Sequence, residues 1–197
     1  MSNPLDSRKS IVLVGMMGAG KTSVGRILAA KLALPFLDAD AEIEAAAQST
    51  IEEIFAHDGE AVFRSGERRV IARLLDGPVA VVATGGGAFM NADTRARIAE
   101  RGISIWLRAD LDLLLKRVAR RKDRPLLKTG DMRETLTKLL AEREPIYAEA
   151  DIVVDSGEQS AELVADKVLA ALQAHLAPPV QGPVQGPDQG PLQGTGS

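Results

Sequence analysis

The segment GMMGAGKT, residues 15–22, is the strongest indication of the fold in this chain. It fits the pattern GxxxxGK[ST], in which glycines let the backbone curl around phosphate oxygens with its N–H groups pointing inward. An apolar run precedes it at residues 11–14, and apolar residues at helical spacing follow it at Val24, Ile27 and Leu28. A strand, a glycine-rich turn and a helix in this order are the context that the motif requires, so the sequence predicts a phosphate-binding loop.

The chemistry of this loop predicts that it binds ATP together with Mg²⁺. The helix that begins near Gly20 directs the positive end of its dipole at the phosphates. Lys21 can reach the β- and γ-phosphates, and the hydroxyl of Thr22 can sit on Mg²⁺. We therefore expect nucleotide binding by five consecutive residues, Gly18, Ala19, Gly20, Lys21 and Thr22.

Outward from the loop, short apolar runs alternate with longer helical patterns. The apolar runs predict buried strands at residues 11–14, 35–37, 79–83, 103–107 and 152–154. Helical patterns cover residues 41–75, residues 132–150 with a kink at Pro145, and a last segment from Ala161 to Leu172, and Asp110 is placed to cap a further helix. This alternation predicts an α/β fold, in which helices cover both faces of a parallel sheet and the ligand site lies at the carboxyl ends of the strands.

Two aspartates, Asp38 and Asp40, follow the second predicted strand. Side chains at positions i and i+2 of an extended segment share a face, so we expect both carboxylates to point into the crevice beside the phosphate loop. One can hold Mg²⁺, directly or through water, and the other can accept a hydrogen bond from the acceptor hydroxyl and take its proton. The alternative is a pair of turn aspartates, or a helix cap at Asp40.

Three glycines, Gly85, Gly86 and Gly87, end the third predicted strand. They allow a ligand to approach the backbone closely, so we expect them to bind substrate, with a flexible turn as the other interpretation. Arg64 lies in the helical pattern FR-x-x-E. Its guanidinium can bind a carboxylate through two parallel hydrogen bonds, although such a residue is more often simply solvated.

Basic residues crowd one short segment that follows the fourth strand. They are Arg117, Arg120, Arg121, Lys122, Arg124 and Lys128. Such a cluster is usually a solvated helix face, but beside a phosphate loop it also suits a lid that supplies positive charge and excludes water. The sequence RPLL breaks the helical pattern there, so we expect a lid at residues 117–130 from which Arg124 swings over the phosphates.

Composition excludes several other classes of function. The 197 residues suit one domain, and with 45% hydrophobic and 26% charged residues an ordinary globular core is expected. A net charge of −3 argues against sequence-independent binding of nucleic acid, and the absence of cysteine excludes disulfides and thiolate chemistry. With no apolar run long enough to span a bilayer and no signal-peptide segment at the start, we expect a cytoplasmic monomer without a membrane partner.

The end of the chain has a different character. Residues 179–194 repeat a four-residue unit as PVQG, PVQG, PDQG and PLQG. Proline and glycine at this density block both helix and sheet, so we predict one folded domain over residues 1–176 and a disordered tail over residues 177–197. Within the domain, residues 40–75 are expected to bind the acceptor.

Together, these motifs resemble those of the shikimate kinases. Five elements occur in that family's order over residues 10–176: GMMGAGKT, the aspartates of FLDAD, FR-x-x-E, the triple glycine, and RPLL followed by R-x-P-x-Y. The resemblance implies transfer of the γ-phosphate of ATP to shikimate, a step of aromatic amino-acid biosynthesis. It also implies a three-layer α/β/α P-loop kinase fold of the nucleoside-monophosphate-kinase type, with five parallel strands in the order 2-3-1-4-5.

For the acceptor, the resemblance implies roles at four matched positions. Asp40 would hold the reacting ring hydroxyls and is the candidate base. Arg64 and Arg143 would bind the shikimate carboxylate, and Gly86 would contribute its backbone N–H.

For the nucleotide, the resemblance implies that Asp38 sits in the Mg²⁺ shell with Thr22 as a ligand. Arg124 would close over the phosphates and Arg117 would stack on adenine, with Gln159 beside it in the loop after the last strand. Lys21, Asp40 and Arg124 would then be the catalytic residues, since phosphoryl transfer depends on positioning and charge neutralisation.

Two other functions stay open at this point. A kinase for gluconate or a nucleoside monophosphate would share the phosphate loop, although gluconate kinases should lack the pairing of FR-x-x-E with three glycines. A nucleotide-binding regulatory module without turnover would be expected to have lost Lys21, Asp40 or Arg124, and all three are present.

Overall fold

A sheet of five parallel strands forms the centre of the protein in the computed structural model, which describes residues 9–119 and 131–177. The strands are β1 (Ser10–Val14), β2 (Phe36–Asp38), β3 (Val81–Ala83), β4 (Gly102–Arg108) and β5 (Ile152–Asp155). Their order is β2-β3-β1-β4-β5, and every neighbouring pair is parallel. The predicted fold class and strand order are therefore confirmed.

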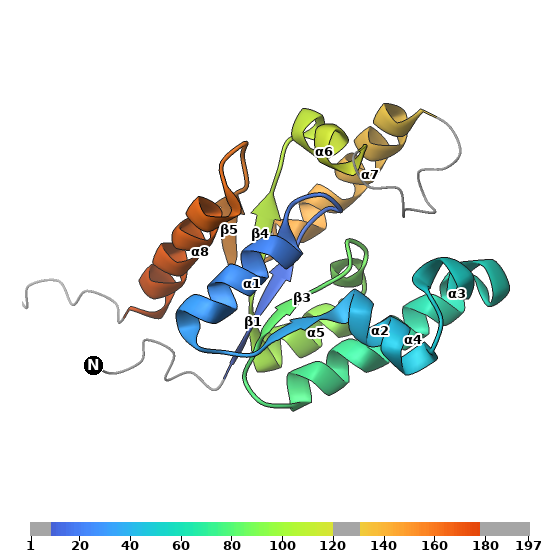
Figure 1. Cartoon of the computed structure of the whole chain (residues 1–197), viewed down its shortest axis with the longest axis horizontal. Coiled ribbons are helices and arrows are strands. Elements are labelled where there is room, and N and C mark those ends of the chain that lie inside the picture. The colour runs from blue at the N-terminus through green and yellow to red at the C-terminus, as the bar shows by residue number, and fades with distance from the viewer. Residues whose placement is uncertain (1–8, 120–130, 178–197) are drawn as a thin grey trace, which may run out of the picture.

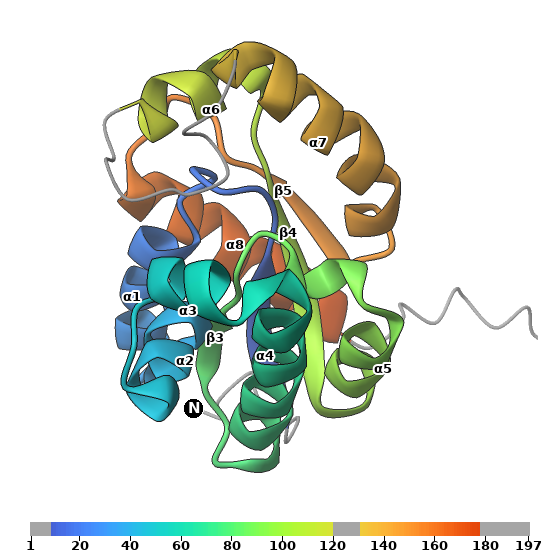
Figure 2. The same cartoon turned by 90° about the vertical axis from the view of Figure 1, so that its right-hand side faces the viewer.

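Helices cover both faces of this sheet. They are α1 (Lys21–Leu32), α2 (Ala39–Ala47), α3 (Ile51–His57), α4 (Gly59–Asp76), α5 (Ala92–Arg101), α6 (Leu111–Val118), α7 (Met132–Tyr147) and α8 (Ala161–Leu176), with a short 3₁₀ turn η1 (Ala88–Met90). Helices α1 and α8 pack on one face, and α4 and α5 lie on the other (Figures 1 and 2). The phosphate loop lies at the carboxyl edge of the sheet. Residues of α1, α2 and α6 surround the sheet at this edge.

Strand β1 is buried along its whole length at the centre of the sheet. All five of its residues are buried, and its neighbours β3 and β4 pair with it in parallel. A strand covered on both faces has no polar side, which explains the apolar run at residues 11–14, while the hydroxyl of Ser10 accepts a 3.2 Å hydrogen bond from the backbone N–H of Ala80. The surrounding core consists mainly of Val, Ile, Leu and Ala side chains, as the low aromatic content predicts.

Side-chain caps define several helix starts. The carboxylate of Asp110 accepts a hydrogen bond of 2.8 Å from the backbone N–H of Leu113, which confirms the predicted cap of α6. Thr50 and Glu53 form a capping box at the start of α3. These caps satisfy backbone N–H groups that a helix cannot pair within itself.

Helix α5 is absent from the sequence prediction. Asn91 caps it by accepting from the N–H of Thr94, but only Thr94 and Ile98 are buried among its residues. So narrow a buried face gives no apolar stripe for periodicity to detect. The long helical pattern at 41–75 also divides into α2, α3 and α4, because the backbone takes positive φ angles at Gln48, just after α2, and at Gly59, the first residue of α4.

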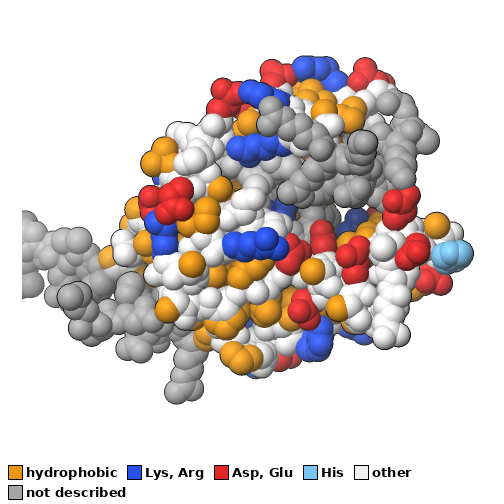
Figure 3. Space-filling view, viewed as in Figure 1, with side chains coloured by type: hydrophobic (Ala, Val, Ile, Leu, Met, Phe, Trp, Pro, Cys, Tyr) orange, Lys and Arg blue, Asp and Glu red, His pale blue; other side chains and the backbone are white. Residues whose placement is uncertain are grey.

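The surface of the described part carries charges of both signs. On the face drawn in Figure 3, Lys and Arg side chains are interspersed with Asp and Glu side chains. Lys31 of α1, for example, pairs with Glu162 and Asp166 of α8 at 2.6 and 2.9 Å. Within residues 9–119 and 131–177, none of the helices combines the length and apolar character needed to cross a bilayer.

Two helical glycines provide a matched test of the packing of α1. A Cβ atom at Gly25 would lie 2.6 Å from Cε2 of Phe36 and 3.1 Å from Cδ1 of Leu13, whereas one at Gly66 would meet nothing within 4 Å. We expect Gly25→Ala to lower the free energy of unfolding by about 1–3 kcal/mol, since overpacking outweighs the better helix propensity of alanine. Gly66→Ala should raise it by up to about 1 kcal/mol.

Urea denaturation of the two variants beside the parent protein measures both changes. A Gly25→Ala protein as stable as the parent would contradict the close packing of α1 on β2.

Candidate active site

The phosphate loop connects β1 to α1 through three glycines with positive φ angles. These are Gly15 at +131°, Gly18 at +84° and Gly20 at +98°. A Cβ atom at Gly15 would also lie 2.7 Å from the carbonyl oxygen of Leu107 at the end of β4. The loop therefore depends on glycine both for its left-handed turns and for its close contact with β4.

Lys21, the first residue of α1, lies over this loop with only 8% of its surface exposed. Its Nζ donates hydrogen bonds to the carbonyl oxygens of Gly15 at 2.7 Å and Met16 at 2.9 Å. A lysine held in this way keeps its positive charge within the curl of backbone that would surround a phosphate.

Asp38 connects the phosphate loop to the start of α2. Its Oδ2 accepts a 2.9 Å hydrogen bond from the hydroxyl of Thr22, and its Oδ1 accepts a 3.1 Å bond from the backbone N–H of Asp40. The second bond makes Asp38 the N-cap of α2.

The predicted geometry of the two aspartates was wrong. Only Asp38 belongs to the strand, and Asp40 lies in the first turn of α2. The cap at Asp38 turns the chain into a helix immediately, so the extended i, i+2 relation does not apply, and Asp40 itself is not the cap. Both side chains nevertheless line the same cavity.

This cavity has a volume of about 380 Å³ and opens beside the phosphate loop. It brings together predicted residues from five parts of the chain: Gly18, Gly20, Lys21, Thr22, Asp38, Asp40, Gly86, Arg117 and Gln159. It is also lined by Ser156, in the loop after the last strand that was expected beside adenine, and by residues that the sequence did not single out for the site, among them Ser23 and Thr84. Ala19 is not part of the lining; its carbonyl oxygen accepts a 2.8 Å hydrogen bond from the hydroxyl of Ser156.

Arg117 spans the two loops that border the far side of the cavity. Its guanidinium donates to the carbonyl oxygens of Gly157 at 2.9 Å and Gly18 at 3.3 Å. It also donates to the hydroxyl of Ser156 at 3.3 Å. The planar group thus lies where the phosphate loop meets the loop after β5, and its stacking on adenine stays a prediction.

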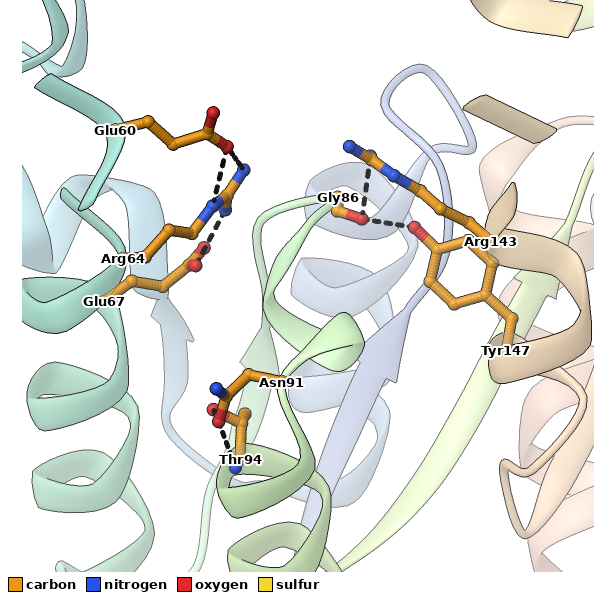
Figure 4. Close-up of polar contacts among 8 residues, drawn as sticks. All are labelled: Glu60, Arg64, Glu67, Gly86, Asn91, Thr94, Arg143 and Tyr147. Atoms are coloured by element: carbon orange, nitrogen blue, oxygen red, sulfur yellow. Dashed lines mark hydrogen bonds and ion pairs between the residues drawn. The ribbon is translucent and has the colours of Figure 1, made fainter. Parts of the chain in front are cut away.

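Three charged side chains, those of Asp40, Arg64 and Arg143, lie close to the backbone of the triple glycine. A Cβ atom at Gly85 would lie 2.7 Å from Oδ1 of Asp40, and one at Gly87 would lie 2.5 Å from Nη1 of Arg64. From the opposite side, Arg143 donates a 3.2 Å hydrogen bond to the carbonyl oxygen of Gly86. Figure 4 shows Arg64 on α4 and Arg143 on α7 on opposite sides of Gly86.

Arg64 is held by carboxylates on its own helix. It donates to Glu67 at 2.8 Å and to Glu60 at 3.2 Å (Figure 4). Burial by itself lowers the pKa of Arg64, but the nearby carboxylates of Glu67 and Glu60 raise it by more. The net effect is a raised pKa, so the guanidinium stays charged. It is about a quarter exposed, with a side-chain exposure of 28%, and so differs from the solvated arginine of the alternative interpretation.

Glu67 is a residue of this site that the sequence reasoning did not assign. It is only 2% exposed, and its Oε1 has no hydrogen-bond partner in the described part of the chain. That oxygen lies 2.9 Å from the position of a Cβ at Gly85, on the same side as Asp40. The i, i+3 spacing of FR-x-x-E indicated its pairing with Arg64, but not its burial beside Asp40.

Two predicted features fall outside the described residues. Arg124 and most of the lid at 117–130 lie in the segment 120–130, and nearly all of the repeat tail lies in 178–197. The remaining site residues are placed around one cavity and its border, where their binding roles stay predictions.

Comparison with known proteins assigns the family. The sequence model of the family described as "Shikimate kinase" matches residues 17–173, which is most of the chain. The chain belongs to the shikimate kinase family. The resemblance inferred from its motifs is therefore confirmed.

Relatives of known sequence and structure agree with this family. The chain is 58% identical over 168 residues to a shikimate kinase from Bradyrhizobium diazoefficiens, covering 85% of this chain and 81% of the relative. It also matches the structure of a shikimate kinase from Acinetobacter baumannii in complex with shikimate, with a TM-score of 0.83, 40% identity, and coverage of 86% and 96%.

A gluconokinase from Sinorhizobium meliloti has a related structure at lower similarity. It has a TM-score of 0.58 and 20% identity, covering 85% of this chain and 93% of that one. This likeness extends to the fold alone, so the gluconate kinase alternative gains no support from it.

The burial of Glu67 predicts a pH-dependent stability. Burial raises its pKa, against the opposing effect of Arg64, so the folded protein binds this proton more tightly than the unfolded chain does. The stabilising contribution is complete below the ordinary pKa of 4.5 and is lost as the pH rises through the raised value. Glu67→Gln keeps the shape of the side chain but does not titrate. As the pH rises through the raised pKa of Glu67, the free energy of unfolding of this variant should therefore fall less than that of the parent protein.

Urea denaturation at several pH values between about 5 and about 8 measures this difference. The exposed Glu142 on α7 supplies the control, because Glu142→Gln should leave the pH profile of the parent unchanged. Parallel profiles for Glu67→Gln and the parent would contradict the raised pKa.

Proposed function

We propose that this chain transfers the γ-phosphate of ATP to a ring hydroxyl of shikimate, giving ADP and shikimate 3-phosphate. The observation that carries the proposal is the meeting of two subsites at Asp40 and Gly86. On one side lies the phosphate-loop cavity, and on the other Arg64 and Arg143 face each other across the triple glycine. Family membership and the shikimate complex of the Acinetobacter relative support this acceptor.

The nucleotide side would hold ATP through the loop backbone, the start of α1 and Lys21. Lys21 is close enough to exchange its bonds to Gly15 and Met16 for phosphate oxygens, which would offset negative charge as the phosphoryl group moves. We assign Arg117 and Gln159 to the adenine end of the cavity and Arg124 to its closure over the phosphates.

Thr22 and Asp38 fit a Mg²⁺ ion that arrives with the nucleotide. Their oxygens lie 2.9 Å apart at the edge of the cavity, and hydroxyl and carboxylate oxygens are the ligands that Mg²⁺ prefers. When bound, Mg²⁺ would neutralise charge on the β- and γ-phosphates. Asp38 already holds the Thr22 hydroxyl, so the pair is oriented by the fold.

The acceptor side would orient shikimate through its carboxylate. Two guanidinium groups that approach the same space from α4 and α7 suit one carboxylate, which can accept two parallel hydrogen bonds from an arginine. The glycines between them leave room for the ring close to the backbone, with Gly86 contributing its N–H. A nucleotide base, which carries no carboxylate, would use this pair of arginines less well.

Asp40 would hold the reacting hydroxyl and accept its proton. Its carboxylate lies between the cavity and Gly85, so it can reach a hydroxyl placed beside the γ-phosphate. The oxygen–hydrogen bond breaks as the oxygen–phosphorus bond forms, and the bond between γ-phosphorus and the bridging oxygen breaks to release ADP. The monomeric state and the cytoplasmic location stay predictions of the sequence.

Coupled measurement of ADP release tests the proposed reaction. With Mg²⁺ and ATP we expect rapid release with shikimate, and only background release with gluconate or nucleoside monophosphates. Lys21→Ala and Asp40→Asn should each lower kcat by at least about 100-fold while the protein stays folded, because each removes a group that acts on the moving phosphoryl or the attacking hydroxyl. Turnover with another acceptor alone would overturn the assignment to shikimate.

The role of Arg64 is tested by separating the two Michaelis constants. Arg64→Ala should raise the KM for shikimate by at least about tenfold and leave the KM for ATP nearly unchanged, because a charged hydrogen bond to the acceptor carboxylate is lost. Arg68, exposed on the same helix, provides the control, and Arg68→Ala should leave both constants unchanged. Equal increases in both constants for Arg64→Ala would count against the carboxylate clamp.

A further inference from the structure

Tyr147, the last residue of α7, is fully buried against the central sheet. Its ring stacks on Trp106 of β4, with centroids 5.7 Å apart, and on Phe89 of η1 at 6.5 Å. These contacts fix the plane of the ring and direct its hydroxyl towards the triple glycine. The side chain is thus anchored by packing and presents one polar atom to the site.

The hydroxyl of Tyr147 donates a hydrogen bond to the carbonyl oxygen of Gly86. The same oxygen accepts the 3.2 Å hydrogen bond from Arg143, one helical turn earlier on α7. Figure 4 shows both donors reaching Gly86 from the same side. Two side chains of one helix therefore hold one carbonyl group in the middle of a glycine-rich loop.

This pair of bonds determines the orientation of the peptide between Gly86 and Gly87. In a trans peptide the N–H points opposite to the C=O, and the protein has no cis peptide bonds in its described residues. Because the Gly86 carbonyl points towards α7, the Gly87 N–H points away from it, towards α4. There the backbone of Gly87 lies so close to Arg64 that a Cβ atom would be 2.5 Å from Nη1.

We propose that Tyr147 is a positioning residue for the acceptor: by holding the Gly86 carbonyl, it orients the Gly86–Gly87 peptide and leaves Arg143 available for the acceptor carboxylate. This inference rests on the proposed function. Glycines would otherwise allow this peptide to rotate at little steric cost. Without the hydroxyl, the half-buried carbonyl of Gly86 would depend on Arg143 alone, and the guanidinium would be drawn away from the ligand.

The surroundings keep the Tyr147 hydroxyl in its donating form. Burial raises the pKa of Tyr147 to about 12, although the positive charge of Arg143 opposes this effect. Arg64 also lowers this pKa, while Glu67 raises it. The hydroxyl therefore donates throughout the pH range in which the enzyme would be assayed.

Removal of the hydroxyl alone tests the inference. Tyr147→Phe retains the stacked ring, and we expect the KM for shikimate to rise about five- to tenfold, with the KM for ATP within about twofold of the parent value. A purely structural role would lower the melting temperature without separating the two constants. Ile98→Val on α5 is the control for a loss of stability alone: Ile98 is 1% exposed and is not part of the cavity lining, so this change should lower stability and leave the KM for shikimate unchanged.

A second measurement does not depend on the stability of a variant. Tyr147 is the single tyrosine of the chain, so 3-fluorotyrosine supplied during growth labels this position alone. The ¹⁹F resonance should shift when shikimate binds to the labelled enzyme. Arg143 would then hydrogen-bond the ligand as well as Gly86, which changes the surroundings of the Tyr147 hydroxyl.

The outcomes distinguish this inference from the proposed function. Equal KM values for shikimate in Tyr147→Phe and the parent, or a ¹⁹F resonance that saturating shikimate does not move, would overturn the positioning role alone. A parent enzyme that releases no ADP with shikimate would overturn the proposed function, and this inference with it.

Discussion

The parallel pairing of β1 with β3 and β4 is the constraint on which the site depends. Because β1 is central, Leu13 lies beside Ala83 and Val14 beside Trp106. The carbonyl of Leu13 accepts from both the backbone N–H and the hydroxyl of Thr84, at 3.1 and 3.0 Å. This pairing joins the start of the phosphate loop to the start of the triple glycine, so the proposed donor and acceptor subsites lie at one edge of the sheet.

Close backbone approach, rather than flexibility, explains the glycines of the acceptor side. At Gly85 a side chain would collide with Asp40 and Glu67, and at Gly87 with Arg64. The carbonyl of Gly86 is in turn held from α7 by Arg143 and Tyr147. The triple glycine is therefore a fixed point at which α2, α4 and α7 converge, and the interpretation as a flexible turn does not describe it.

Acidic and basic side chains gather at the same point, where Glu67 is buried and Asp40 and Arg64 are half-buried. Glu67 and Asp40 approach Gly85 together, and Arg64 balances them from α4. Glu67 holds the guanidinium of Arg64 in place as an internal carboxylate, and an anionic ligand placed between Arg64 and Arg143 would compete with it. This arrangement orients Arg64 before the acceptor arrives and limits the rearrangement that binding requires.

The sequence alone predicted the phosphate loop and the parallel α/β sheet, because short motifs and apolar runs reveal them, whereas the strand order followed only from the resemblance to a family that the combined motifs indicated. It placed Asp38 and Asp40 in the site for an incorrect reason, since the cap that starts α2 at Asp38 was not recognised. Helix α5 was not predicted from the sequence, because few of its side chains are buried. Only the tertiary structure decided that Glu67 is buried beside Asp40, and that Tyr147 holds Gly86 across 61 positions of the chain. Such contacts depend on the register of strands and the packing of distant helices, which no local pattern encodes.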